Sequence, residues 1–349
     1  MVARCARPKK KPGVTPIETK RKTNVMALTA QITEQGSPDV IQWVDTELPP
    51  PGPGEVQMRH TAIGLNFIDT YHRGGVYKLP LPNGLGVESA GVVEAVGPDV
   101  QGIAPGDRVC TFGPVLGAYA TARNISAKLL FPTPDDISDE MAAAVMLKGC
   151  TVEFLVERCA KVQPGWTVLV HAAAGGVGLL LVQWLKAIGA TVIGTVGSAE
   201  KADLARAAGA DHIIDYTTED VGVRCRELTH GAGVPVIFDG VGKSTWEGSL
   251  KSCAPRGLIV SFGNASGPVT DVALGRLAEA GSIFVTRPTL FHYYATPAER
   301  QAGAARLFDM LRTGAVKVDI RQRYPLLEAA RAHQELEARQ TSGCSLLIP

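Results

Sequence analysis

The chain has 349 residues, a formal net charge of +1 and 45% hydrophobic residues, a composition typical of a globular protein. Its length predicts two domains, because one domain usually takes about 100–200 residues. The near-neutral charge argues against nucleic acid as a main partner, and no apolar run approaches the ~20 residues needed to cross a membrane. The seven cysteines form no C-x-x-C pair, so we expect reduced thiols in a cytoplasmic protein.

Residues 1–25 differ from the rest of the chain, because they hold eight basic residues and a single acid, Glu18. We expect a disordered tail or a misassigned start here. An organelle transit peptide is the open alternative, since such peptides are rich in arginine and poor in acids.

From residue 29 to 113, short alternating apolar stretches are separated by Gly and Pro turns. Three of them predict strands, at Val56–His60, Ala90–Val96 and Arg108–Phe112. Short strands at close spacing predict a β-rich, barrel-like module. A helix is predicted next, within Ser138–Arg158.

From residue 163 the pattern changes to strands alternating with helices, which predicts βαβ units and a parallel sheet. The predicted strands are Thr167–His171, Thr191–Val196, Asp211–Asp215, Val234–Asp239 and Leu258–Phe262, and the helices between the first three are Leu179–Ile188 and Ala199–Ala208. After a helix at Pro297–Thr313, a strand at Ser345–Ile348 is expected to return to the first module.

The turn after the first of these strands has the pattern A-x-G-x-x-G, with Ala173, Gly175 and Gly178 at the defined positions. Gly175 would let the backbone approach a pyrophosphate, and Gly178 would let the helix pack closely on the strand. The helix N-terminus supplies free N–H groups for phosphates. Since the loop follows a strand and opens a helix, dinucleotide binding is predicted.

The next strand favours NADPH over NADH. NAD sites usually place an acid about 20 residues past the loop to bind the ribose 2′-hydroxyl. Here the segment Gly194–Ser198 has no acid until Glu200, and Lys201 follows at the start of a helix, where a cation suits a 2′-phosphate.

Six motifs together resemble the zinc-independent quinone oxidoreductases (ζ-crystallin-like) of the medium-chain dehydrogenase/reductase superfamily. They are GLNFIDTY at 64–71, GLGVESAG at 84–91, LKGCT at 147–151, the glycine loop at 171–178, VSFGN at 260–264 and TSGCSLLIP at 341–349. The similarity covers residues 26–349 in order, so it is far more specific than any one motif.

The resemblance implies an α/β protein made of a GroES-like β-barrel catalytic domain and a Rossmann domain with a doubly wound parallel sheet. It places the catalytic domain at 26–150 and 288–349 and the NADPH-binding domain at 151–287, with the active cleft between them. It also implies a homodimer joined through the Rossmann sheets near 282–289.

The resemblance further implies which residues form the site. Tyr71 and Asn66 are the expected catalytic residues and would border the nicotinamide, with Tyr71 as the candidate hydrogen-bond partner of a substrate oxygen. Cofactor packing alone is an equal alternative for Tyr71. The expected cofactor-binding residues are Asn66, Tyr71, Thr151, Ala174, Gly175, Gly176, Val177, Gly197, Lys201, Tyr216, Gly240, Phe262, Gly263, Asn264 and Arg339. One departure is Gly240, where close relatives carry serine.

No metal is expected, because the positions that bind catalytic zinc in the related alcohol dehydrogenases hold Asn66, Val87 and Leu147. Zinc makes alcohol oxidation feasible by lowering the pKa of the bound oxygen. A site without it suits acceptors such as quinones and conjugated carbonyls, and the function expected is NADPH-dependent quinone reduction. The alternatives are an NADPH-dependent alkenal/enone reductase and an NADPH- or single-stranded-RNA-binding protein without a main catalytic role.

Three polar residues near these motifs are expected to support the site rather than react. His171 is predicted to be packed and hydrogen-bonded, and Asp69 and Glu88 to orient their neighbours.

Overall fold

The computed structural model describes residues 24–349. Residues 1–23, and with them nearly all of the predicted tail, lie outside the described residues. The first strand, β1, opens at Val25, one residue before the predicted start of the catalytic domain.

The N-terminal part is β-rich, as predicted, and is built from two sheets that are antiparallel except for the parallel pair β15 and β16. A three-stranded sheet has the order β2-β1-β4, and a seven-stranded sheet has the order β15-β16-β3-β5-β6-β8 with β7 paired to β3. The strands are β1 (Val25–Ile32), β2 (Gln42–Leu48), β3 (Glu55–Leu65), β4 (Asn83–Gly84), β5 (Glu88–Val96), β6 (Arg108–Phe112), β7 (Ala122–Ser126), β8 (Leu130–Pro132), β15 (Ile320–Pro325) and β16 (Cys344–Ile348).

The helices on this side include one that was not predicted, α1 (Phe67–Gly74), which begins directly after β3. A second unpredicted helix, α10 (Ala329–Glu337), packs beside it. Short 3₁₀ turns lie at Pro38–Val40, Ala127–Leu129 and Leu326–Glu328.

The other part is a six-stranded parallel sheet with the order β11-β10-β9-β12-β13-β14. This doubly wound order reverses direction between β9 and β12, and such a switch point opens a crevice at the carboxyl ends of the strands. The strands are β9 (Thr167–Val170), β10 (Thr191–Val196), β11 (His212–Asp215), β12 (Val234–Asp239), β13 (Cys253–Ser261) and β14 (Phe284–Thr286). The helices around them are α3 (Gly176–Ile188), α4 (Ala199–Ala207), α5 (Val221–Leu228), α6 (Trp246–Ser252) and α7 (Gly275–Glu279).

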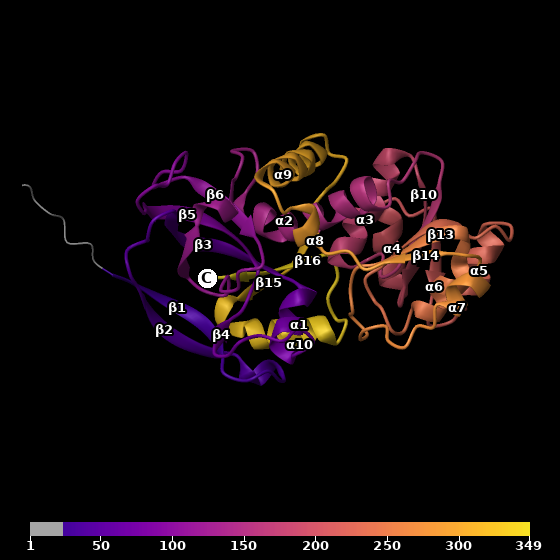
Figure 1. Cartoon of the computed structure of the whole chain (residues 1–349), viewed down its shortest axis with the longest axis horizontal. Helices are drawn as coiled ribbons and strands as arrows, with labels where there is room; N and C mark the ends of the chain where they lie inside the picture. The colour runs from indigo at the N-terminus through magenta and orange to yellow at the C-terminus, as the bar shows by residue number, and fades with distance from the viewer. Residues whose placement is uncertain (1–23) are drawn as a thin grey trace, which may run out of the picture.

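The segment α2 (Asp139–Glu153) lies between the two parts and continues as a π-helix, Phe154–Cys159 (Figure 1). Its residues Ala142–Met146 are fully buried and belong to a core cluster that reaches both sheets. The helix α9 (Pro297–Arg312) packs closely on α2, since a Cβ at Gly149 would lie 2.4 Å from Leu307 Cδ1. The short α8 (Leu290–Tyr293) precedes α9.

The C-terminal strand returns to the first part, as predicted. The register pairs Leu346 of β16 with Gly64 of β3, antiparallel. In Figure 1 the yellow end of the chain therefore lies among the indigo and purple strands, far along the molecule from the orange six-stranded sheet.

Candidate functional site

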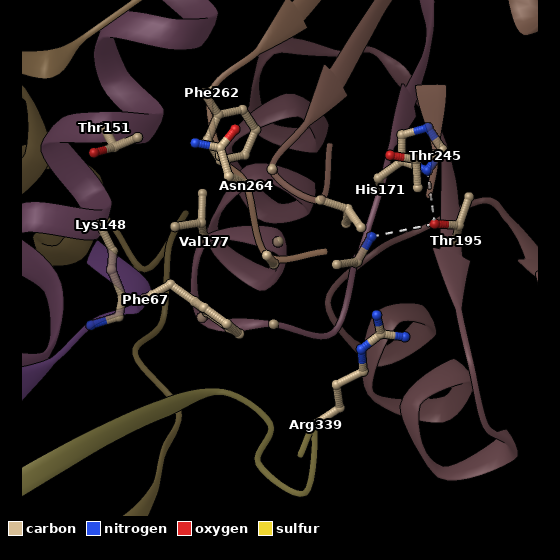
Figure 2. A pocket seen from close by; sticks show the side chains of 18 of the residues that line it. Phe67, Lys148, Thr151, His171, Val177, Thr195, Thr245, Phe262, Asn264 and Arg339 are labelled. Carbon is tan, nitrogen blue, oxygen red and sulfur yellow. Dashed lines mark hydrogen bonds between the residues drawn. The ribbon is translucent and has the colours of Figure 1, made fainter. Parts of the chain in front are cut away.

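One large cavity of about 1190 Å³ receives residues from both parts of the molecule. All fifteen residues predicted for the site line it, from Asn66 and Tyr71 on the barrel side to Lys201 and Tyr216 beyond β10. Figure 2 shows Thr151, Val177, Phe262, Asn264 and Arg339 around this space. The structure thus brings the predicted set together, while the role of each member stays a prediction.

The glycine loop forms one wall of the cavity. Gly175 is the N-cap of α3, and no side chain caps this end of the helix. A Cβ at Gly178 would lie 2.2 Å from Ala172 O, so only glycine allows this close contact between α3 and the turn after β9. A Cβ at Gly175 would lie 3.3 Å from the same oxygen. The free N–H groups at the start of α3 consequently face the space where an anion can bind.

The C-terminal segment lies across this loop. Gly343 pairs with Gly175 as an isolated parallel bridge, and Gly343 N donates to Ala174 O at 3.3 Å. Further along, Lys201 Nζ donates to Arg339 O at 2.8 Å. Burial, with a smaller contribution from the Arg339 charge, lowers the pKa of Lys201. Two cations therefore meet at this end of the cavity, which suits a phosphate.

Two other glycines make room for aromatic rings. A Cβ at Gly197 would lie 2.3 Å from Tyr216 Oη, so the glycine lets the tyrosine ring fold over β10. A Cβ at Gly240 would lie 2.9 Å from the Phe262 ring. Close relatives carry serine at position 240, whereas here the Phe262 ring lies where a serine side chain would be.

Asn66 is held in place by two buried carboxylates. Its backbone N donates to Asp69 Oδ2 at 2.9 Å, and its Nδ2 donates to Glu88 Oε2 at 2.8 Å. The other Glu88 oxygen accepts from Leu147 N at 2.6 Å. Both acids orient their neighbours, as predicted. Burial raises the pKa of Asp69 to about 7 and also raises the pKa of Glu88, against the opposing charge of Lys148.

Lys148 was not predicted as part of the site, although it stands in the LKGCT motif. Its side chain is only 8% exposed; its Nζ donates to Leu65 O at 3.2 Å and lies 3.6 Å from Glu88 Oε2. Its stem lines the cavity beside Gly176. Figure 2 shows the Lys148 side chain at the edge of this space. A buried lysine needs such a partner, because an unpaired charge is costly to bury. Its partner Glu88 lies far away in the sequence, so spacing could not reveal the pair.

Tyr71 reaches across the cavity to the other part. Its hydroxyl oxygen accepts a hydrogen bond from the backbone N–H of Asn264 at 3.0 Å, and its ring makes an edge contact with Tyr77 at 5.5 Å between centroids. Burial raises the pKa of Tyr71 to about 12, so the hydroxyl keeps its proton near neutral pH and can donate it in a hydrogen bond.

His171 is packed and hydrogen-bonded, as predicted. Its Nδ1 lies 3.2 Å from Thr195 Oγ1 (Figure 2). Its Nε2 lies 2.9 Å from Ser249 Oγ. Burial lowers its pKa, which keeps the ring neutral near pH 7. The histidine thus links the end of β9 to β10 and α6 through hydrogen bonds.

The positions that hold zinc ligands in related alcohol dehydrogenases carry poor metal ligands here. Asn66 uses its amide nitrogen on Glu88, and Val87 is a buried apolar residue. Leu147 is likewise apolar and buried. Within residues 24–349, no group of three or more His, Cys, Asp or Glu is arranged to hold a metal ion.

Comparisons with known proteins agree with this architecture. Residues 52–135 match the alcohol dehydrogenase GroES-like domain family, and residues 176–308 match the zinc-binding dehydrogenase family. The chain is 52% identical to a quinone oxidoreductase of Pseudomonas aeruginosa, over 93% of this chain and 100% of that protein. The chain belongs to the quinone oxidoreductase family.

Two further relatives of this family extend the comparison. The crystal structure of the Escherichia coli quinone oxidoreductase complexed with NADPH superimposes with a TM-score of 0.90 at 48% identity, covering 92% of this chain and all of that one. A 2-haloacrylate reductase of a Burkholderia species is 43% identical over 93% of this chain and 99% of that protein. As a quinone oxidoreductase family member the chain is an oxidoreductase with a GroES-like domain and a Rossmann-type parallel sheet. No helix among residues 24–349 combines the length and the apolar character that crossing a bilayer requires.

Proposed function

We propose that this protein is an NADPH-dependent quinone oxidoreductase. The observation that carries the proposal is the shared cavity, which joins the glycine loop and the Lys201–Arg339 pair at one end to Tyr71, Asn66 and Asn264 at the other. This order of groups along the cavity matches an elongated dinucleotide that has a phosphate at one end and a redox ring at the other. The chain's relatives, including one solved with NADPH, support the same cofactor.

The residues present fit NADPH. The uncapped start of α3 and the glycines at 175 and 176 leave backbone N–H groups for a pyrophosphate. Lys201 and Arg339 supply positive charge for the 2′-phosphate, with Gly197 and Tyr216 beside them. When bound, NADPH supplies a hydride equivalent, and with one proton it converts one quinone into one hydroquinone and NADP⁺.

At the other end, this chain's residues position and polarise the acceptor. Tyr71 donates its hydroxyl proton in a hydrogen bond to the acceptor oxygen while Asn264 N–H holds the tyrosine oxygen. Asn66, held by Asp69 and Glu88, orients the ring that approaches it. Thr151, Ala174, Val177, Gly240, Phe262 and Gly263 complete the wall around the cofactor. Such fixed dipoles stabilise charge where it develops during the reaction.

The test is oxidation of NADPH against NADH with 1,4-benzoquinone and 9,10-phenanthrenequinone, in the presence of a metal chelator. We expect chelator-resistant turnover with a preference for NADPH. Loss of activity on chelation would contradict the zinc-free site, and NADPH binding without turnover of any quinone would contradict quinone reduction.

The alternative reaction is reduction of a conjugated carbonyl substrate. It is favoured by the 43% identity to the 2-haloacrylate reductase, because a haloacrylate carries a conjugated carbon–carbon double bond. Turnover of an enone such as 3-buten-2-one, with no turnover of quinones under the same conditions, would identify this activity.

A homodimer through the six-stranded sheet is also proposed. The edge strand β14 exposes the apolar side chains of Phe284, 63% exposed, and Val285, 39% exposed. An exposed apolar edge strand is an efficient place for a second copy to pair. Substitution Phe284→Lys should shift the mass measured by light scattering from dimer to monomer, while an unchanged mass would place the interface elsewhere.

The predicted domain limits, 26–150 with 288–349 and 151–287, are kept as part of the proposal. So is the cytoplasmic location. The sheet memberships described above support the domain division, because β15 and β16 join the sheet of β3.

A further inference from the structure

Arg287 follows the edge strand β14 and lines the cavity at its Tyr71 end. Its Nη1 donates to Ser261 O at 2.9 Å, and its Nη2 lies 3.3 Å from Tyr77 Oη. Both partners are neutral. Within residues 24–349 no carboxylate forms an ion pair with this guanidinium.

The Arg287 guanidinium also contacts Asn264, the residue whose backbone binds the Tyr71 hydroxyl. With the Asn264 amide oriented to satisfy both of its polar atoms, its oxygen accepts from Arg287 Nη2 at 3.1 Å and its nitrogen donates to Gly263 O at 2.9 Å. The backbone N–H of the same Asn264 donates to Tyr71 Oη. The Arg287 guanidinium is thus linked through Asn264 to the Tyr71 hydroxyl, which is proposed to bind the acceptor.

The other cations of the cavity have different surroundings. Lys148 lies beside Glu88, and Lys251 Nζ lies 3.3 Å from Asp220 Oδ2. Lys201 donates to the carbonyl of Arg339 at the phosphate end. Figure 2 shows Arg339 on the opposite side of the space from Asn264. Arg287 therefore brings a positive charge without an acidic partner to the acceptor end.

We propose that Arg287 makes the enzyme select acceptors that carry an anionic group, a carboxylate or sulfonate, beside the quinone ring or conjugated double bond. The inference rests on the proposed function, since it names the substrate class of the same site. A guanidinium binds a planar carboxylate or a sulfonate through two parallel N–H donors. Arg287 is solvent-exposed at the mouth of the cavity, so an ion pair formed there is screened by water and salt. The acceptor's anionic group would replace the neutral Tyr77 hydroxyl as the partner of Nη2.

The test compares 1,2-naphthoquinone-4-sulfonate with 1,2-naphthoquinone as acceptors. They share the ring and differ by one sulfonate, which adds a negative charge and also withdraws electrons, so the decisive quantity is how the ratio of the two kcat/KM values changes between wild type and Arg287→Gln. We expect the wild-type enzyme to prefer the sulfonated quinone, and added NaCl to reduce that preference. Arg287→Gln should lower kcat/KM for the sulfonated quinone by roughly fivefold, the upper end for an exposed ion pair, and change the value for the neutral quinone by less than about twofold. Arg287→Lys, which keeps the charge, should retain part of the preference. Arg59→Gln, on the exposed surface of β3, is the matched control.

An equal loss on both quinones, or no loss on either, would overturn the inference. A second measurement separates it from the proposed function. A calorimetric titration of the sulfonated quinone into NADP⁺-saturated protein measures its binding, because NADP⁺ cannot reduce it. Weaker binding in Arg287→Gln supports the inference even if no acceptor is turned over, and equal binding in both proteins rejects it even if quinone reduction is found. Far-UV circular dichroism confirms that each variant is folded.

Discussion

The hydroxyl oxygen of Tyr71 accepts the backbone N–H of Asn264 at 3.0 Å, although the two residues are 193 positions apart in the sequence. Tyr71 lies on α1, which follows the barrel strand β3, and Asn264 lies in the loop after β13 of the parallel sheet. The bond therefore joins the two parts of the molecule at the acceptor end of the cavity. It also leaves the hydroxyl proton available for a substrate oxygen.

Replacing Tyr71 with phenylalanine removes that donor and keeps the ring. We expect Tyr71→Phe to lower kcat/KM for quinones by roughly 100- to 1000-fold, the range typical of a lost hydrogen bond to a charge-developing oxygen. The dissociation constant of NADPH should change little. Steady-state kinetics and fluorescence titration give the two quantities. If NADPH affinity falls as much as turnover does, Tyr71 packs the cofactor instead of acting on the acceptor.

Lys201 should decide between NADPH and NADH. We expect Lys201→Ala to raise KM for NADPH by about tenfold or more, since a charged hydrogen bond contributes about 1.5–3 kcal/mol, while KM for NADH stays nearly constant. Lys128→Ala, an exposed lysine on the barrel, serves as the control. A parallel rise in both KM values would show that the residue acts on packing of the loop, not on the 2′-phosphate.

Gly240 allows the Phe262 ring to lie where a Cβ would be 2.9 Å away. Gly240→Ser should therefore displace the ring and lower the free energy of unfolding by about 1–3 kcal/mol, the usual cost of overpacking. Combining it with Phe262→Leu, which vacates the ring position, should recover much of that loss. Urea unfolding of the two variants and the wild type measures both effects; equal stability of Gly240→Ser and wild type would mean that the ring moves without cost.

Asp69 predicts a pH dependence of stability. Burial raises its pKa from 3.8 to about 7, so between these values the folded protein holds a proton that the unfolded chain has released. Stability contributed by the neutral Asp69 is complete below pH 3.8 and is lost as the pH rises toward 7, by up to about 1.4 kcal/mol per pH unit. Asp69→Asn cannot ionise, so its stability relative to the wild type should rise across this range. Urea unfolding at several pH values from 4.5 to 8 checks this, and a difference that is independent of pH would show that Asp69 stays ionised.

The Lys148–Glu88 pair predicts a strong coupling. Lys148→Met should destabilise the protein by about 3–5 kcal/mol, because it leaves a buried carboxylate without a cation. Adding Glu88→Gln should restore part of the loss, although it also changes the partner of Asn66. A double-mutant cycle measured by urea unfolding gives the coupling energy. Additive effects of the two substitutions would show that the charges do not depend on each other.

The parallel sheet was predictable from the sequence with the right bounds for β10 and β12, because glycines end the apolar β-branched runs there. The helix α1 was not predicted, since its buried face carries Asp69 and Arg73 in place of an apolar stripe. Burial of these polar groups depends on partners distant in sequence, Tyr119 for Asp69 and Glu337 for Arg73. The pattern of residues within one segment does not reveal such distant partners.

In the site, too, some residues were predictable from a local motif and others depend on partners distant in the sequence. Its glycine positions follow from backbone requirements that a short motif expresses directly, and the resemblance supplied the remaining members of the predicted set. Lys148 and Arg287 escaped prediction because a single lysine in a helix and a single arginine after a strand usually belong to the solvated surface. Only the fold places Lys148 against Glu88 and Arg287 beside Asn264.

The pairing of β16 with β3 has a consequence for synthesis on the ribosome. β3 emerges early, yet its partner residues at 345–347 come after every strand of the parallel sheet. The nascent chain can thus assemble the parallel sheet while the barrel is still incomplete, with part of the β3 edge unpaired and open to other strands. The seven-stranded sheet begins before the parallel sheet and closes after it, so aggregation during translation is expected to begin at β3 and to end once residue 347 is free to pair.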